Sequence, residues 1–203
     1  MLSSFLIKPS PLTFYAYKKI MDQNQPKAFS DFLDIGYRTG LRSKFLCNLK
    51  KENVDLNKKV ITGNDPKTSL PIYVVLDDGS FSILERRIKN TKSEYIFSDN
   101  NGKPYSLSYY RTCFMKTLES EPLNFNLKEE HMNLHSIRAG NREMLKEFHV
   151  PIFEITFRQN TDLYGSSHVA YVTDQTKSVD AINKFFPMMH DIINQRELNG
   201  YYD

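Results

Sequence analysis

The sequence predicts an α+β fold that is mostly helical and contains one small antiparallel β-sheet. Apolar residues recur at helical spacing over most of the chain. Between residues 54 and 76, strand-like runs rich in β-branched residues flank a tight turn. The 203 residues, of which 40% are hydrophobic and 25% are charged, are enough for one domain with a substantial core.

The first half of the chain is expected to form helices and then the sheet. Helical segments are predicted at 12–22, at 29–36 and from Leu41 to Leu49. Pro and Asn residues break the pattern at 23–26. Strands are predicted at 54–56, 59–62 and 70–76, with Gly63-Asn64-Asp65-Pro66 as the turn before the last strand.

The second half is predicted to be helical. Asp77-Asp78-Gly79 ends the sheet and caps a helix over 80–89, and another helix is expected over 106–118. From Leu134 to the end the helical pattern is interrupted by Pro151, Gly165 and Pro187, and Pro187 is suited to begin a second helix in the tail. The tail has apolar residues at helical spacing, namely Ile182, Phe185, Phe186, Met189, Ile192 and Ile193.

The net charge of +3 is compatible with a nucleic-acid partner but does not require one. Basic residues gather in two runs, Arg38, Arg42, Lys44, Lys50 and Lys51, and then Arg86, Arg87, Lys89 and Lys92. Such runs also occur on solvated helix faces, so both interpretations stay open.

Two cysteines, Cys47 and Cys113, lie in apolar periodic segments. They are expected to be buried thiols of a reducing compartment and not a disulfide framework. The apolar start, Met1 to Ile7, has no basic region before it and is cut short by Lys8-Pro9, so no signal peptide is expected. No apolar stretch is long enough to cross a membrane, and we expect an intracellular protein without a membrane partner.

The most informative motif is His135-Ser136-Ile137-Arg138. Arg42 lies 96 residues before Arg138, Lys67 lies between the two arginines, and Tyr171 follows Arg138 by 33 residues. Two arginines can clamp one phosphate, a histidine and a lysine can move protons, and a tyrosine can attack phosphorus. This ordered set is suited to breaking and resealing a DNA strand without a metal or another cofactor.

These motifs resemble the catalytic domain of tyrosine recombinases, the phage-integrase family. The family's first box, Thr-Gly-x-Arg, is matched by Thr39-Gly40-Leu41-Arg42. The family's hairpin lysine is matched by Lys67 before Leu70-Pro71-Ile72, and its His-x-x-Arg box by His135 to Arg138. The resemblance spans roughly residues 29–176, and it implies a catalytic domain there, an N-terminal helix or linker at 1–28 and a C-terminal helical tail at 177–203.

The resemblance implies a site-specific recombinase that acts on double-stranded DNA through a 3′-phosphotyrosine intermediate. The catalytic residues would be Arg42, Lys67, His135, Arg138 and Tyr171. The chain would form a homo-oligomer on DNA through its tail; the alternative is that the apolar stripe of the tail closes the chain's own core. In the family a separate N-terminal domain closes the DNA clamp, so a clamp-domain partner is a further expectation.

Two positions depart from the family pattern. The third His or Trp would fall at Asn160-Thr161, and the acidic residue three positions after the first arginine is replaced by Phe45. These departures motivate an alternative, a recombinase-derived DNA-binding protein with weakened catalysis. A helical interaction protein that does not bind DNA is the third hypothesis.

Other interpretations of the same residues remain. Tyr164, before Gly165-Ser166-Ser167, is a rival nucleophile. Arg42 can pair with an acid, Lys67 can be solvated, His135 and Arg138 can form a surface pair, and Tyr171 can be core. The Gly63 to Thr68 run lacks the spacer of a phosphate-binding loop, and His131 with His135 lacks a third zinc ligand, so no metal is expected.

Overall fold

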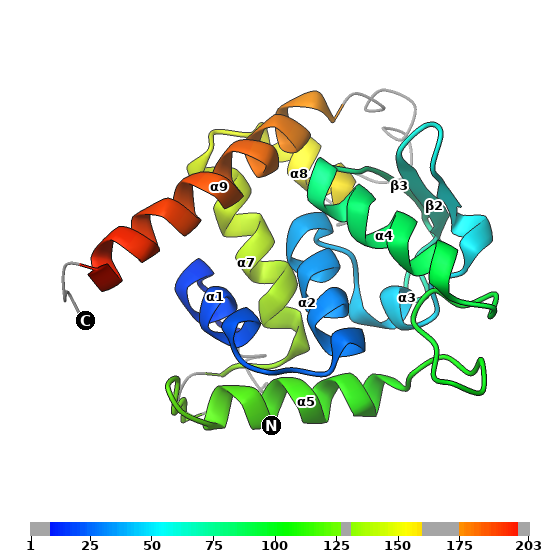
Figure 1. Ribbon diagram of the computed structural model, residues 1–203. Coiled ribbons are helices and arrows are strands. Elements are labelled where there is room, and N and C mark those ends of the chain that lie inside the picture. Colours follow the sequence, from blue (N-terminus) through cyan, green and yellow to red (C-terminus); the bar gives the residue numbers. More distant parts are fainter. Residues whose placement is uncertain (1–8, 127–130, 160–174, 199–203) are drawn as a thin grey trace, which may run out of the picture.

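The computed structural model describes residues 9–126, 131–159 and 175–198. Helix α2 (Lys27–Thr39) lies at the centre, between α4 (Asp78–Asn90) and α7 (Leu134–Glu147) (Figure 1). Apolar side chains on several faces of α2 are at most 2% exposed, namely Phe29, Phe32, Leu33, Ile35 and Tyr37. Burial of this kind contributes about 1.5–3 kcal/mol per large apolar side chain, which makes α2 the axis of the core.

The predicted antiparallel sheet is confirmed. It has the order β1 (Val54–Asp55), β2 (Val60–Asn64) and β3 (Pro71–Val75). In the β2–β3 hairpin Val60 pairs with Val75 and Asn64 pairs with Pro71. The turn therefore begins at Asp65, two residues later than the predicted start, and holds Lys67.

Four further elements are described around α2. They are α3 (Ser43–Cys47), a 3-10 turn (Lys51–Asn53), α5 (Leu107–Glu119) and α8 (Ile152–Arg158). The ring of Tyr110 in α5 stacks on Phe32 with 3.7 Å between centroids. Cys47 is buried as expected, but Cys113 is half-buried, because it lies beside the exposed face of α5; both are free thiols. Within the described ranges, no helix has the length and apolar character needed to cross a lipid bilayer.

Helix α1 (Phe14–Asp22) lies on the side of the core away from the sheet, and α9 (Thr176–Leu198) runs from beside α8 across the core toward that side (Figure 1). The Phe14 ring meets Phe185 and Phe186 edge-on, with centroids 4.8 Å and 5.5 Å apart. Ile182 and Ile193 of α9 are also buried. The inner face of the tail therefore packs on the chain's own core.

The expectation that Pro187 begins a second helix is wrong, because α9 continues through it. A proline inside a helix removes one hydrogen bond and costs about 3 kcal/mol. Buried apolar residues lie on both sides of it, Phe185 and Phe186 before and Ile193 after. Their burial against one core holds both halves of the helix in line and offsets that cost.

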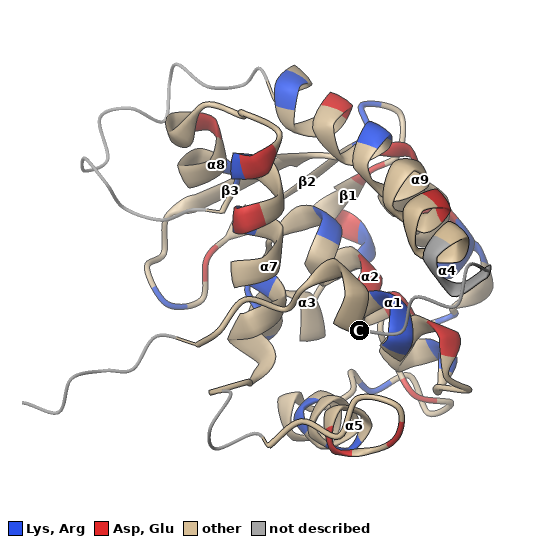
Figure 2. Ribbon diagram, turned by 90° about the vertical axis from the view of Figure 1, so that its left-hand side faces the viewer, with Lys and Arg blue, Asp and Glu red and all other residues tan. Residues whose placement is uncertain are grey.

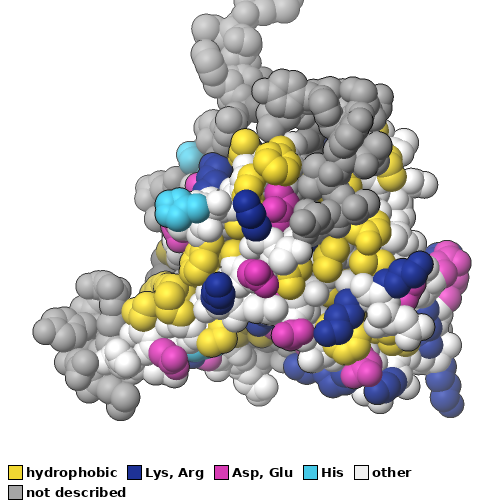
Figure 3. All heavy atoms as spheres, turned by 90° about the horizontal axis from the view of Figure 1, so that it is seen from above, with side chains coloured by type: hydrophobic (Ala, Val, Ile, Leu, Met, Phe, Trp, Pro, Cys, Tyr) yellow, Lys and Arg dark blue, Asp and Glu magenta, His cyan; other side chains and the backbone are white. Residues whose placement is uncertain are grey.

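Charged positions of both signs are interspersed along the helices (Figure 2). On the face seen in Figure 3, Lys and Arg side chains also lie next to Asp and Glu side chains and among hydrophobic ones. A concentration of positive charge at one place must therefore be created by the fold, since the net charge is only +3.

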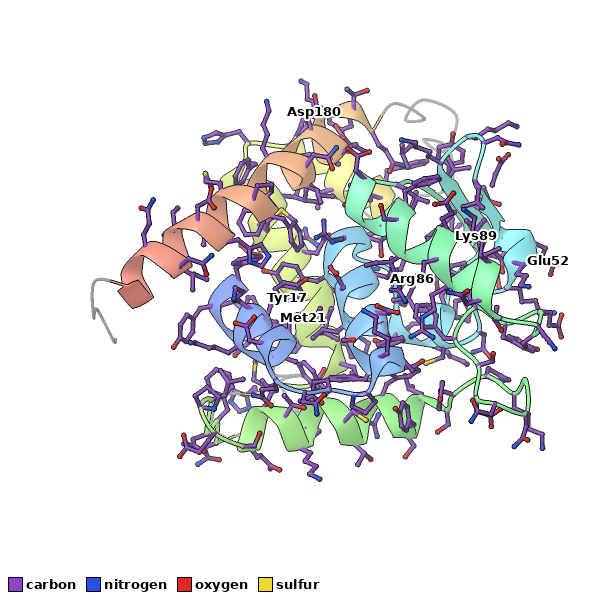
Figure 4. The ribbon with its side chains drawn as sticks, viewed as in Figure 1. Tyr17, Met21, Glu52, Arg86, Lys89 and Asp180 are labelled. Carbon is purple, nitrogen blue, oxygen red and sulfur yellow. The ribbon has the colours of Figure 1, made fainter. Side chains whose placement is uncertain are left out.

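Part of the second basic run serves the fold. Asp31 of α2 is 2% exposed and accepts hydrogen bonds from Arg86 and Arg87 of α4, at 2.8 Å and 2.7 Å. Lys27 adds an ion pair at 3.0 Å. Arg86 lies between α4 and α2, whereas Lys89 lies farther along α4 (Figure 4). A buried carboxylate needs such partners, so these two arginines fix α4 on α2.

Gly140 sets the distance between α7 and the start of the described chain. A Cβ atom at this position would lie 2.2 Å from the Leu12 carbonyl oxygen and 2.7 Å from a Tyr37 ring carbon. The Leu12 N–H donates to the Ser136 carbonyl at 2.8 Å, so this backbone cannot retreat without losing a hydrogen bond. The close approach places α7, with His135 and Arg138, against α2.

We predict that Gly140→Ala lowers the free energy of unfolding by about 1–3 kcal/mol because of this overlap. Helix propensity alone would raise the free energy of unfolding by about 1 kcal/mol. The sign of the measured change in this free energy therefore shows which of the two effects is larger. Urea denaturation measures it, and Ala139→Gly in the same helix calibrates propensity. A stabilised Gly140→Ala variant would show that the approach is not tight.

Candidate active site

The first arginine of the predicted site follows a turn that requires glycine. Gly40 ends α2 with φ of 67°, and a Cβ there would lie 2.4 Å from the Asn141 side-chain oxygen. The Thr39 hydroxyl donates to the Ile35 carbonyl at 2.6 Å and so fixes the last turn of α2. Arg42 is placed by this turn as the N-cap residue of α3.

Arg138 of α7 is held by the carbonyl groups of two other segments. Its Nη1 donates to the Gly40 carbonyl at 2.7 Å, and its Nη2 donates to the Gln159 carbonyl. Burial lowers the pKa of Arg138 to about 9, and nearby Arg42 acts in the same direction. The structure thus brings the two arginines of the sequence motif together across 96 residues of chain.

His135 lies one helical turn before Arg138. Asn133 caps α7 by accepting the His135 backbone N–H at 2.8 Å, which fixes where the helix begins. The pKa of His135 is lowered, first by partial burial and then by Arg138, Arg42 and Lys67. Arg111 acts in the same direction. An imidazole that burial and these cations keep in its neutral form has a free nitrogen lone pair and is able to accept a proton at neutral pH.

Lys67 is exposed in the β2–β3 turn, as the sequence predicts. The turn is held by Asp65, whose Oδ1 accepts the backbone N–H groups of Lys67 and Thr68 at 2.8 Å and 3.0 Å. Asp65 Oδ2 accepts a hydrogen bond from Arg42 Nη1. Arg42 does pair with an acid, as one open interpretation held, but this acid also fixes the turn that carries Lys67.

Sequence reasoning missed two polar residues of the site, Asp65 and Gln159. Asp at the start of a turn is common and was part of the predicted turn, but nothing local connects it to Arg42. Gln159 donates from Nε2 to the Arg138 carbonyl at 3.1 Å and to the Asn141 side-chain oxygen at 2.8 Å. No sequence signal marks Gln159, because its partners lie 18 and 21 residues away.

Tyr171 and its rival Tyr164 lie outside the described residues, as do Asn160 and Thr161. The assignment of the nucleophile stays a prediction.

The residues that flank 160–174 are anchored to the core. Before it, Arg158 is 1% exposed and donates to the Val75 carbonyl at 2.7 Å and to Gln175 Oε1 at 2.8 Å. After it, Gln175 donates to the Tyr73 carbonyl at 2.7 Å and accepts the Val75 N–H at 3.1 Å. The amide side chain of Gln175 therefore pairs with β3 as a neighbouring strand would.

We predict that Arg138→Gln raises the pKa of His135. A neutral side chain removes one of the positive charges that oppose protonation of the imidazole, so protonation becomes easier. The titration of the His135 ring protons by NMR measures this pKa. Arg86→Gln is the matched control, because Arg86 pairs with Asp31 and does not act on His135. An unchanged His135 pKa in Arg138→Gln would show that the two side chains are not coupled.

Comparisons with known proteins bear on the family and the fold of this chain. Residues 12–155 match the model of the phage integrase family. The integrase from mycobacterium phage Brujita has a similar structure, with a TM-score of 0.68, 13% identity and coverage of 89% of this chain and 59% of that one. The Tn1549 transposon integrase in complex with a circular intermediate DNA gives a TM-score of 0.67 at 16% identity, covering 89% of this chain and 63% of that one.

The lambda integrase catalytic core covers 77% of this chain, and this chain spans 95% of it, with a TM-score of 0.63 and 18% identity. The chain thus spans about three fifths of the length of the Brujita and Tn1549 proteins. A comparison with curated protein sequences gave no match. At these identities the structures establish a shared fold, and the family model covers most of the chain. The resemblance seen in its motifs is confirmed: the chain belongs to the phage integrase family.

Proposed function

We propose that this chain is a site-specific DNA recombinase that cleaves and rejoins DNA strands through a 3′-phosphotyrosine intermediate. The observation that carries the proposal is the positively charged group assembled from three separate segments. Arg42 lies at α3, Lys67 in the β2–β3 turn, and His135 and Arg138 on α7. Besides partial burial, the charges of Arg138, Arg42 and Lys67, together with Arg111 of α5, all lower the His135 pKa. Asp65 bonds both the Arg42 side chain and the Lys67 backbone, and Arg138 bonds the Gly40 carbonyl two residues before Arg42, so the segments that carry these residues are joined by hydrogen bonds.

This group suits phosphodiester transesterification. The reaction concentrates negative charge on the non-bridging oxygens of a five-coordinate phosphorus. A guanidinium group is planar, permanently charged and able to donate two parallel hydrogen bonds, so two of them suit that state. Arg138 is already oriented by two carbonyl groups before any DNA binds.

In the proposed step the Tyr171 hydroxyl oxygen forms a bond to phosphorus while the bond from phosphorus to the 5′ oxygen breaks. The phenol has an ordinary pKa of about 10 and needs a base, and His135 accepts its proton. Lys67 donates a proton to the leaving 5′ oxygen. The 3′ phosphate stays on the tyrosine, and attack by a 5′ hydroxyl reverses the step and reseals the strand.

Two observations support Tyr171 as the nucleophile. It follows Arg138 at the spacing that the family resemblance implies, and it lies four residues before Gln175, which is fixed on β3. Double-stranded DNA is the proposed substrate, and the Tn1549 and lambda integrases have been solved as DNA complexes. A separate clamp-domain partner is part of the proposal, and without it affinity is expected to fall steeply with salt.

We predict that a nicked suicide duplex gives a covalent protein–DNA adduct that survives SDS electrophoresis. Tyr171→Phe should remove the adduct, because it deletes the attacking oxygen and little else. Tyr164→Phe is the matched control and should form the adduct at the normal rate. The opposite pattern would make Tyr164 the nucleophile, and no adduct from the wild-type chain would contradict strand transfer.

Arg138→Lys tests whether the cleavage activity of the chain can be separated from its DNA binding. Lysine is a point charge that cannot donate to the Gly40 and Gln159 carbonyls and also form a fork toward phosphate. The variant should form no adduct while duplex binding in an electrophoretic shift stays within about 3-fold, since one phosphate contact is a small part of the total. Binding without an adduct in the wild-type chain would favour the weakened binding protein.

We also propose that the chain forms a homo-oligomer on DNA through α9. Its inner face closes the core, whereas Met188 and Ile192 are 44% and 37% exposed. Ile152 and Phe153 of α8 are exposed as well, and Figure 3 shows hydrophobic side chains at the surface among charged ones. These outer residues are available to a neighbouring protomer.

We predict that the double substitution Met188→Ser and Ile192→Ser reduces higher-order complexes in the electrophoretic shift while Tm changes by at most about 2–4 °C. Truncation of the whole tail would not separate the two roles of α9, because the inner face is core. Phe185→Ala is the matched control on that inner face, and it should cost about 3–5 kcal/mol of stability. Higher-order complexes that persist in the double variant would contradict assembly through this face.

A further inference from the structure

Asp65 joins the two elements that carry Arg42 and Lys67. Its side chain is buried, and both carboxylate oxygens are engaged. Oδ1 accepts the backbone N–H groups of Lys67 and Thr68, and Oδ2 accepts Arg42 Nη1. One carboxylate therefore fixes the backbone of the proposed general acid and the side chain of a proposed phosphate-binding arginine.

The carboxylate is charged over the pH range in which the site would work. Burial alone would raise the pKa of Asp65, but the two amide hydrogen bonds and the Arg42 guanidinium outweigh it and lower the pKa. Asp65 also opposes the lowering of the Arg138 pKa by Arg42 and Arg142. Its charge thus stabilises a cluster of cations that would otherwise repel one another.

The surroundings of Asp65 show why the acid stands on the hairpin. Phe45, three positions after Arg42, is 8% exposed and packs against β2. A Cβ atom on Gly63 would lie 2.9 Å from the Phe45 ring. The ring therefore occupies the space between α3 and the hairpin, and the carboxylate that meets Arg42 comes from the hairpin, two residues after Gly63.

We propose that Asp65 is a positioning residue for strand transfer, which holds the Arg42 guanidinium and the Lys67 turn in a fixed mutual arrangement. The proposal rests on the proposed function. Reacting groups misplaced by about 1 Å can slow an enzyme by about 10²-fold, and without Asp65 the side chain and the turn would move independently. The alternative is that the Arg42–Asp65 ion pair only supports the fold. Its loss would then lower the free energy of unfolding without changing the cleavage rate of the folded protein.

Asp65→Asn is the decisive variant. Asparagine keeps an oxygen for the turn amides but loses the charge that holds Arg42. Single-turnover cleavage of a nicked suicide duplex should slow by about 10²-fold, with DNA binding within about 3-fold. The matched control is Asp55→Asn, because Asp55 accepts the backbone N–H groups of Asn57 and Lys58 at 2.9 Å in the same way. The control should cleave within about 2-fold of the wild-type rate. Asp65→Asn should lower Tm more than the control does, because it removes a buried negative charge from a cluster of cations, so cleavage by both variants is measured well below the lower Tm.

Amide hydrogen exchange provides a readout that needs no catalysis. Arg42→Ala should speed exchange at the Lys67 and Thr68 amides, because the carboxylate that they bond loses its other partner. Unchanged exchange at these amides, or wild-type cleavage by Asp65→Asn, would overturn the proposal; if Asp65→Asn does not fold, the exchange result decides. A wild-type chain that forms no adduct would instead reject the proposed function, and the exchange result would still report whether Asp65 joins the two elements.

Discussion

The arrangement of the site depends on the two hydrogen bonds that Arg138 donates to backbone carbonyls. The Gly40 carbonyl lies at the end of α2 and the Gln159 carbonyl at the end of α8, so one guanidinium on α7 joins three segments. The Gln159 side chain in turn donates a hydrogen bond to the Arg138 carbonyl. Carbonyls at helix ends lack intrahelical partners, and here a charged donor satisfies two such groups and is oriented by them.

Local patterns in the sequence predicted most of the fold. The core helices were predictable because apolar residues at helical spacing, such as Tyr110 and Phe114 in α5, are buried wherever the helix packs. The hairpin was predictable from its turn and its β-branched strand residues. The prediction failed at Pro187. The rule that proline begins or ends a helix considers only neighbouring residues, whereas α9 stays continuous because Phe185, Phe186 and Ile193 pack against other parts of the chain.

The sequence predicts that the site contains positively charged side chains, but it does not predict which basic residues belong to the site. Arg38 belongs to the same basic run as Arg42, yet Arg38 pairs with Asp34 and Asp77 and lies 3.5 Å from the centre of the Phe186 ring. Arg86 pairs with buried Asp31. Composition cannot separate a basic residue that supports the core from one that faces a ligand, because deciding partners such as Asp77 for Arg38 and Asp31 for Arg86 lie far away in sequence. Asp65 was missed for the same reason.

The two arginines of the site are held by different kinds of partner. Arg42 is paired with a carboxylate, so its charge is largely compensated where it lies. Arg138 is held by neutral carbonyl dipoles that use two of its five N–H groups and has no carboxylate bonded to it among the described residues, and burial, followed by the charge of Arg42, lowers its pKa to about 9. By linkage, an anion that binds beside Arg138 must restore that pKa, and the same free energy tightens the binding of the anion. In the proposed function, the attraction for a phosphate would therefore be asymmetric: strongest on the side of α7 and weaker on the side of the hairpin.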